Sequence, residues 1–159
     1  MSALHVELAR RMRVMLPDLE REWRAALDAW TRQSSDPLDR EVFFDSACLH
    51  IHGFFTGVER LLELIARRLD KTVPTGEVWH QELLYRMRTP VPDRRPAVLT
   101  DESALMLDKL RRFRHVVRNV YPMELEESRA AEVFALMPQL WPQLRSEILR
   151  FADFLEAIL

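Results

Sequence analysis

Apolar side chains recur every three or four residues along most of this chain, which is the spacing of one face of an α-helix. The 159 residues include 24 Leu but only 4 Ile and 3 Gly. Leu favours helices and Gly disfavours them, so we expect an all-α protein. The length is that of one domain, and we expect residues 1–159 to form a single helical domain.

Turn and breaker residues divide the chain into four principal helices and one short helix. The first four predicted helices cover approximately residues 3–33, 38–70, 75–87 and 100–121. A last helical region begins at about residue 127 and continues to the C-terminus. Thr100 or Asp101 is the expected N-cap of the fourth helix. Residues 89–97 are rich in Pro and predict an extended loop. Long helices with short connections are typical of an antiparallel bundle.

Individual residues refine these boundaries. Pro17 predicts a kink or break in the first helix, and Pro138 and Pro142 predict a division of the last one. Thr75 is the expected N-cap of the short helix. Two glycines four residues apart, Gly53 and Gly57, predict close packing of the second helix against a neighbour.

Charge and composition exclude several classes of protein. The net charge of −2 gives no global attraction for nucleic acid, so any such site must be a local patch. Cys48 is the only cysteine, which excludes an intrachain disulfide. We expect neither a secretory leader nor a membrane span, and the sequence has no Gly-rich phosphate loop. We therefore expect a cytoplasmic protein without a cofactor, a bound metal or a membrane partner.

The most unusual segment is KLRRFRHVVRNVY, residues 109–121, in which five basic residues and one His occupy ten positions. On a helix, Arg114, Arg118 and Tyr121 share one face, and His115 and Asn119 share the adjoining face. Like charges four residues apart repel by about 0.2–0.5 kcal/mol, and a bound phosphate would offset that repulsion. The alternative is a solvated basic face that acidic residues elsewhere balance.

Five segments together resemble the HEPN superfamily (higher eukaryotes and prokaryotes nucleotide-binding), and within it the HepT-like ribonuclease toxins. That branch carries Arg-x4-His-x-Tyr on one helix, and residues 114–121 match it except that Asn119 replaces the His. HIHGFFTGVERLL, the segment 75–83, RPAVLTDES and LRSEILRFADFLE are similar too, so the resemblance covers roughly residues 40–156.

The resemblance implies an all-α homodimer in which two motif helices form a composite cleft. Active members are metal-independent endoribonucleases, often paired with a minimal nucleotidyltransferase antitoxin that attaches AMP to the motif Tyr. Carried onto this chain, the expected catalytic residues are Arg114, His115, Asn119 and Tyr121, with Tyr121 also the AMP-acceptor candidate. The expected RNA- and phosphate-binding residues are Arg111, Arg118, His80, Trp79 and His52.

Asn119 leaves three outcomes open, because an amide does not accept a proton at neutral pH. In the first outcome His115 supplies the acid–base function, and in the second catalysis is slow and relies on the electrostatics of Arg114 and Arg118. The third outcome is a non-catalytic HEPN module that binds a nucleotidyltransferase partner or a nucleotide. The expectation is cleavage of RNA, with tRNA a candidate substrate; the alternative is binding alone.

Overall fold

A computed structural model describes residues 2–120 and 127–158, which are helical along most of their length. The elements are α1 (Ala3–Ser35), α2 (Arg40–Ile65), the π-helical turn η1 (Ala66–Asp70), α3 (Trp79–Arg88), α4 (Asp101–Val120) and α5 (Glu127–Ala157). The expected all-α class is confirmed, with four long helices and one short helix. In the part of the chain described, no helix is long and apolar enough to cross a membrane.

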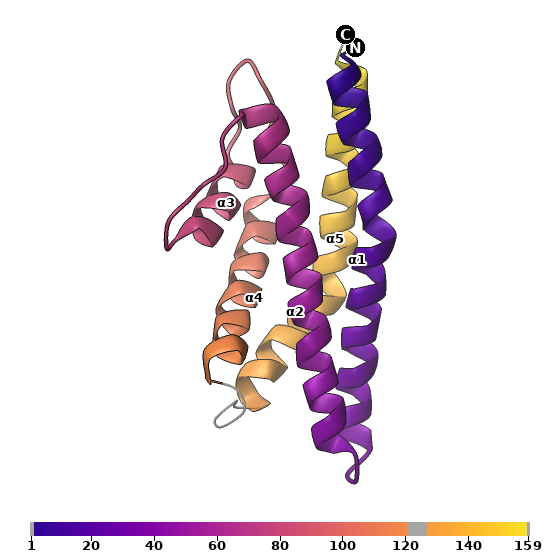
Figure 1. The fold of residues 1–159 in the computed structure, drawn as a ribbon. Coiled ribbons are helices and arrows are strands. Elements are labelled where there is room, and N and C mark those ends of the chain that lie inside the picture. The colour runs from indigo at the N-terminus through magenta and orange to yellow at the C-terminus, as the bar shows by residue number, and fades with distance from the viewer. Residues whose placement is uncertain (1, 121–126, 159) are drawn as a thin grey trace.

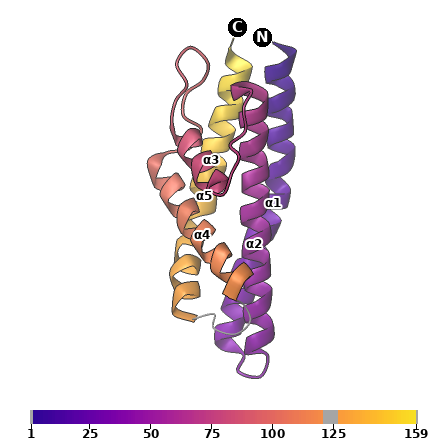
Figure 2. The ribbon, with the colours of Figure 1, turned by 60° about the vertical axis from the view of Figure 1, so that its left-hand side comes forward.

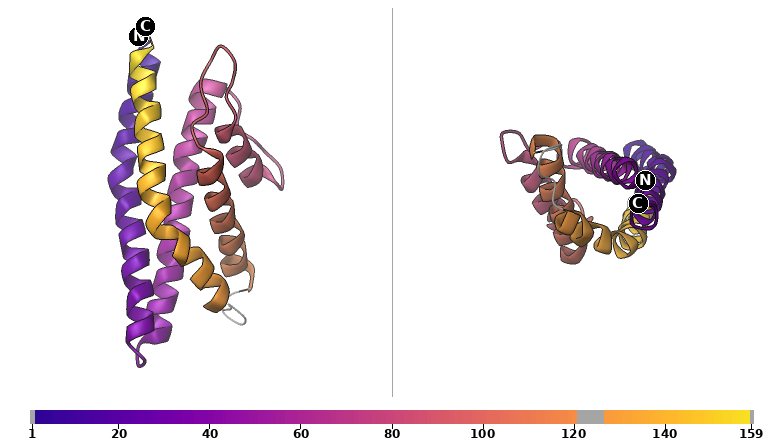
Figure 3. Two further views of the ribbon diagram at one scale, coloured as in Figure 1. Left: turned by 180° about the vertical axis from the view of Figure 1, so that it is seen from behind. Right: turned by 90° about the horizontal axis from the view of Figure 1, so that it is seen from below.

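The four long helices form a closed ring. Helix α1 packs against α2 and α5, and α4 closes the ring by packing against both α2 and α5. Neighbours in the ring run antiparallel, as Figure 1 shows, and the view from below in Figure 3 shows the ring end-on. Helix α3 lies outside the ring against α4 and α2, which Figure 2 brings forward.

The core of the ring is apolar and includes the α1–α2 contact that the glycines predict. Phe54 and Trp141 meet edge-to-face across it with ring centroids 5.7 Å apart. A Cβ built on Gly57 would lie 2.5 Å from Cδ2 of Leu19 on α1, so any side chain at this position would displace that of Leu19. The predicted close packing at Gly57 is confirmed.

The three helix prolines interrupt their helices less than the sequence predicts. Helix α1 runs through Pro17 without a break, because its apolar face stays anchored on both sides of that residue. Helix α5 also continues through Pro138 and Pro142, although Figure 3 shows that it changes direction along its length. The indole N–H of Trp23 donates to the carbonyl of Met137 in this region, at 2.8 Å. The predicted division of α5 is a bend, which is the usual effect of proline in a helix held by its neighbours.

The segment that carries α3 also differs from its prediction. Thr75 does not cap α3, because Gly76 adopts φ +97° and the first helical residue is Trp79. The loop 89–97 is not extended: Val91 and Arg95 face each other across a tight turn with Asp93 at φ +59°. The predicted N-cap is therefore three residues early, because Val78 precedes the first helical residue, and the loop is tighter than predicted.

A buried arginine holds this turn against the end of α2. The side chain of Arg95 is fully buried, and its Nε and Nη2 donate to the two carboxylate oxygens of Asp70 at 2.8 and 2.7 Å. Its remaining N–H groups donate to the carbonyls of Arg86, Thr89 and Pro96. All five donors of the guanidinium are thus satisfied, which makes burial of the charge tolerable. The ion pair fixes α3 relative to α2.

The start of α4 is anchored to α5. Thr100 caps the helix as expected, since its Oγ1 accepts from the backbone N–H of Ser103 at 3.2 Å. Buried Glu147 of α5 accepts from the backbone N–H of Thr100 at 2.6 Å and from the hydroxyl of Ser103. A carboxyl group at a helix N-terminus also interacts favourably with the helix dipole. These bonds set the position of α4, which carries the basic segment.

Candidate functional site

One buried carboxylate connects three helices beside the basic segment. Glu59 of α2 keeps only 5% of its side chain exposed. Its Oε1 accepts from Nη1 of Arg114 on α4, and its Oε2 is hydrogen-bonded to Nδ1 of His80 on α3. The Arg114 side chain is 14% exposed and the His80 side chain 27%. Glu59 therefore neutralises Arg114 and orients His80 with the same carboxyl group.

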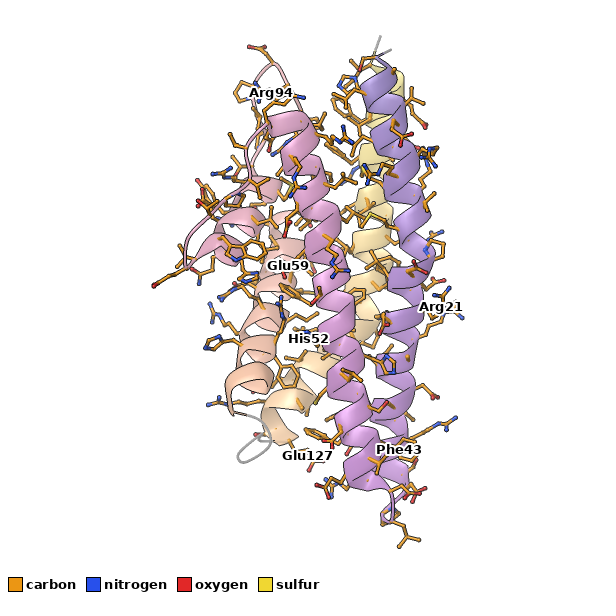
Figure 4. The ribbon with its side chains drawn as sticks, in the orientation of Figure 1. Arg21, Phe43, His52, Glu59, Arg94 and Glu127 are labelled. Atoms are coloured by element: carbon orange, nitrogen blue, oxygen red, sulfur yellow. The ribbon has the colours of Figure 1, made fainter. Side chains whose placement is uncertain are left out.

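The apolar stripe of α2 explains why Glu59 is buried. Phe55 precedes it by one turn on the same helix face, and the guanidinium carbon of Arg114 lies 5.4 Å from the centroid of the Phe55 ring. Figure 4 shows Glu59 on the side of α2 that faces α4. A carboxylate in such a place must be paired to stay charged. The ring of helices supplies the pairing from α3 and α4.

A cavity of about 260 Å³ opens next to this network. At about 30 Å³ for each water molecule, it has room for a phosphodiester together with part of a ribose. It is lined by Glu77, Val78, His80, Gln81, Arg111, Arg114 and His115. Two arginines and two histidines from helices α3 and α4 thus converge on one concave surface.

The two arginines are paired within the chain but retain donors. Nε of Arg111 donates to Asp108 at 2.7 Å, and Nη1 of Arg114 donates to Glu59. Each guanidinium has five N–H donors, so most of them stay available to an anion in the cavity. The acidic partners also hold the guanidinium planes in place, which lowers the entropy that a bound anion must overcome. The arrangement suits a phosphate that is positioned rather than merely attracted.

Four of the predicted site residues come together at this cavity. These are Arg114, His115, Arg111 and His80. The backbones of Arg118 and Asn119 belong to α4, and their side chains lie outside the described part of the chain. Tyr121 lies outside the described residues altogether. The structure thus places half of the predicted catalytic set at the cavity and describes neither the side chain of Asn119 nor Tyr121.

Trp79 and His52 stand apart from the other predicted binding residues. The ring of Trp79 packs against that of His80 with centroids 3.6 Å apart, but Trp79 is not among the residues that line the cavity. His52 lies on α2 two helical turns before Glu59 and is half-buried on the side toward α4 in Figure 4. It does not line the cavity either. In this single chain, neither residue lines the cavity that the other four surround.

Glu59 is the residue that sequence reasoning missed. It lies in the segment VERLL, between the buried residues Val58 and Leu61, and its own exposure is 4%. An acidic residue three or four positions from apolar neighbours on both sides is the signal that identifies it. The segment contributes to the family resemblance, and Glu59 is its buried charge.

The cavity has the groups for proton transfer and for charge stabilisation. Imidazole accepts and donates protons near neutral pH, and guanidinium stabilises negative charge on phosphoryl oxygens. Among the described side chains, no group of three or more His, Cys, Asp or Glu is placed to hold a metal ion. The arrangement of the described residues fits chemistry on a phosphate ester.

Comparison with known proteins supports the resemblance. A family model described as "HepT-like protein" matches residues 46–155, a stretch that includes α3, α4, most of α2 and nearly all of α5. No curated protein and no solved structure matches the chain. The matched stretch contains Glu59, His80 and Arg114 and covers well over half of the chain. The chain belongs to the HepT-like family of HEPN proteins.

Proposed function

We propose that this chain is a metal-independent endoribonuclease of the HepT-like toxin type. The observation that carries the proposal is the cavity at which Arg111, Arg114, His80 and His115 converge. Attack of an RNA 2′-hydroxyl on the adjacent phosphate needs a proton acceptor near that hydroxyl and cations around the phosphoryl oxygens. The cavity offers both. The products are a 2′,3′-cyclic phosphate and a 5′-hydroxyl end.

In this proposal Arg114 is the phosphate clamp and Arg111 a second contact. The family suggests a homodimer with a composite cleft, in which Arg118, Trp79 and His52 contact RNA along the cleft. Family membership also suggests a nucleotidyltransferase antitoxin as partner, with Tyr121 as the AMP acceptor. The substrate is single-stranded or looped RNA, and tRNA is the first candidate.

Cleavage of mixed tRNA in the presence of EDTA tests the proposal. Arg114→Ala removes the arginine that neutralises buried Glu59 and endangers folding, so Arg114→Lys is measured beside it. Lysine keeps the charge and loses the fork that matches phosphate oxygens. We expect cleavage by the wild type and a loss of at least about tenfold in Arg114→Lys, with its fold confirmed by circular dichroism.

The matched control is Arg21→Ala. Arg21 is exposed, pairs with Asp18 on α1, and lies on the opposite side of the molecule in Figure 4. The substitution Arg21→Ala removes one arginine that does not line the cavity, so cleavage should be unchanged. A wild-type chain that leaves RNA intact in EDTA, and that stays inactive as Asn119→His, would contradict the proposal.

Asn119 and the Glu59–Arg114 pair favour a second candidate. The family motif has a His at the position where this chain has Asn119, whose side chain is an amide. Glu59 already balances the charge of Arg114. Both features suit a non-catalytic module that binds a nucleotidyltransferase partner or a nucleotide. Silence of the wild type together with cleavage by Asn119→His would favour this candidate.

A further inference from the structure

We propose that His80 is the general base of this site, in place of the His that Asn119 displaces. The inference rests on the proposed endoribonuclease function and names the group that takes the proton. His80 is not on the motif helix: it lies at the second position of α3, 39 residues before Asn119. The Glu59 contact and the cavity bring it to the motif arginine.

The hydrogen bond to Glu59 fixes which nitrogen of His80 is basic. A carboxylate only accepts hydrogen bonds, so Nδ1 of His80 must carry the proton in the contact with Oε2. In the neutral ring the lone pair is then on Nε2. His80 lines the cavity, and Nε2 is the ring nitrogen left for a molecule bound there. The site therefore contains a proton acceptor whose tautomer a buried group determines.

The same carboxylate also sets the distance between base and clamp. Arg114 binds one oxygen of Glu59 and His80 binds the other. The guanidinium and the imidazole are thus separated by two hydrogen bonds and one carboxyl group. A phosphodiester that contacts Arg114 places its ribose beside the cavity wall that His80 forms. Fixed placement of base and clamp is what an acid–base step requires of a site.

The proton balance of the step is complete with groups already named. The 2′-oxygen forms a bond to phosphorus as its proton passes to Nε2 of His80. The bond between phosphorus and the 5′-oxygen breaks, and that oxygen takes a proton from water. The imidazolium formed on His80 is stabilised by Glu59, and it returns its proton to solvent. Nothing is oxidised or reduced, and no further reactant is needed.

His115 is the competing candidate, because it lines the same cavity and follows Arg114 directly. The side chain of His115 is exposed, and that of His80 is hydrogen-bonded to Glu59, whose side chain is 95% buried. A base gains from a fixed tautomer and orientation, as the Asp–His pair of serine proteases illustrates. The described contacts give that orientation to His80.

Three measurements on two variants test the assignment. His80→Ala and the control His50→Gln are compared in single-turnover cleavage, in binding of an RNA with 2′-O-methyl groups, and in added imidazole. His50 is also paired through Nδ1 with a glutamate, Glu22 at 2.8 Å, but on the α1–α2 side. We expect His80→Ala to cleave about 10²- to 10⁴-fold more slowly, with binding unchanged and partial rescue by imidazole. His50→Gln should behave as the wild type.

Each outcome has a stated meaning. Wild-type-like cleavage by His80→Ala overturns the assignment while the proposed function stands. Parallel loss of binding and cleavage, or a loss that imidazole does not rescue, also overturns it, because His80 then holds RNA or structure. Absence of cleavage by the wild type overturns the proposed function and the assignment together.

The role of Glu59 has a spectroscopic test that does not depend on activity. Histidine ¹⁵N spectra distinguish a proton on Nδ1 from one on Nε2. We expect His80 to be the Nδ1–H tautomer in the wild type and to lose that preference in Glu59→Gln, whose amide also donates. Glu59 would then be a positioning residue. An Nε2–H tautomer in the wild type overturns the assignment even if the chain cleaves RNA.

Discussion

At the scale of single residues, the structure distinguishes arginines that can bind a ligand from arginines that only stabilise the fold. Arg95 uses all five of its donors inside the protein, so it is structural. Within the described part of the chain, Arg114 donates to Glu59 through one nitrogen, and it also lines a cavity. The number of donors left over, rather than burial alone, distinguishes an arginine that binds a ligand from one that holds the fold.

Cys48 gives a pH-dependent prediction at the same scale. Burial, with a smaller contribution from the nearby charge of Asp45, raises the pKa of the Cys48 thiol from 9.0 to about 12. At pH 8 the thiolate fraction should be about 10³-fold lower than for a free thiol with the lower pKa. We expect iodoacetamide to leave the folded protein unmodified at pH 8 and to modify it rapidly in denaturant.

The same shift affects stability at high pH. The folded state keeps the proton more tightly than the unfolded state, so this contribution is fully present below pH 9 and is lost as the pH rises toward 12. Cys48→Ala removes it, and its stability should fall less between pH 9 and 11. Equal alkylation of folded and unfolded protein at pH 8 would contradict the burial on which both expectations rest.

At the scale of elements, the position of α4 depends on a carboxyl group of α5. In Glu147→Ala, the backbone N–H of Thr100 and the buried hydroxyl of Ser103 lose their acceptor. We expect the free energy of unfolding to fall by about 2–3 kcal/mol, because buried donors without a partner are costly. Urea denaturation measures the change, and Glu147→Gln should lose less.

Glu132→Ala is the control for this change. Glu132 is on the same helix and is exposed, so its removal should alter the free energy of unfolding by less than about 0.5 kcal/mol. Equal effects of the two alanine variants would mean that Glu147 does not anchor α4.

The sequence predicted which segments form helices more accurately than where the helices begin and which segments they contact. Helical periodicity located all five helices, because a stripe of buried side chains repeats over many turns. The start of α3 was missed because the φ of Gly76 is decided by the path of the chain, not by the capping preference of Thr75. The unbroken course of α1 through Pro17 was missed because packing on two neighbours outweighs a local preference.

The site was predicted in part for the same reason. Arg111, Arg114 and His115 are within one segment, and spacing alone groups them. The sequence predicted His80 as a binding residue but not its connection to Arg114. That connection runs through Glu59. Contacts between α2, α3 and α4 leave no periodic pattern along the sequence. Arg95, read as part of an open loop, is a fully buried ion-pair partner. Contacts between distant segments are what the sequence alone did not give.

At the scale of the whole molecule, the balance of charge bears on how RNA binds. The net charge is −2, and acidic residues pair with both cavity arginines. Binding should therefore depend on a few local contacts. Each phosphate contact with a single strand contributes about −0.7 to the slope of log K against log salt, so Arg111 and Arg114 predict a slope of about −1.4 for each site.

Titration of 2′-O-methyl RNA at several salt concentrations measures this slope. Arg111→Gln should make it shallower by about 0.7. Arg10 is exposed and pairs with Glu7 on α1, so Arg10→Gln should leave the slope unchanged. A slope steeper than about −4 in the wild type would mean that a broad basic surface, not the cavity, binds the RNA.

The π-helical turn η1 makes the site sensitive to chain length. Such a turn contains one residue more than an α-helix needs for the same bonds. Deleting one residue of Ala66–Asp70 would let α2 continue with regular bonding, but everything after it would rotate by about 100°. Asp70 would then leave Arg95, and α3 would lose the anchor that keeps His80 against Glu59. Substitutions at the exposed Arg67 and Arg68 should be tolerated far more readily than a one-codon deletion. Related chains are therefore expected to vary at these two positions but not in the length of the segment.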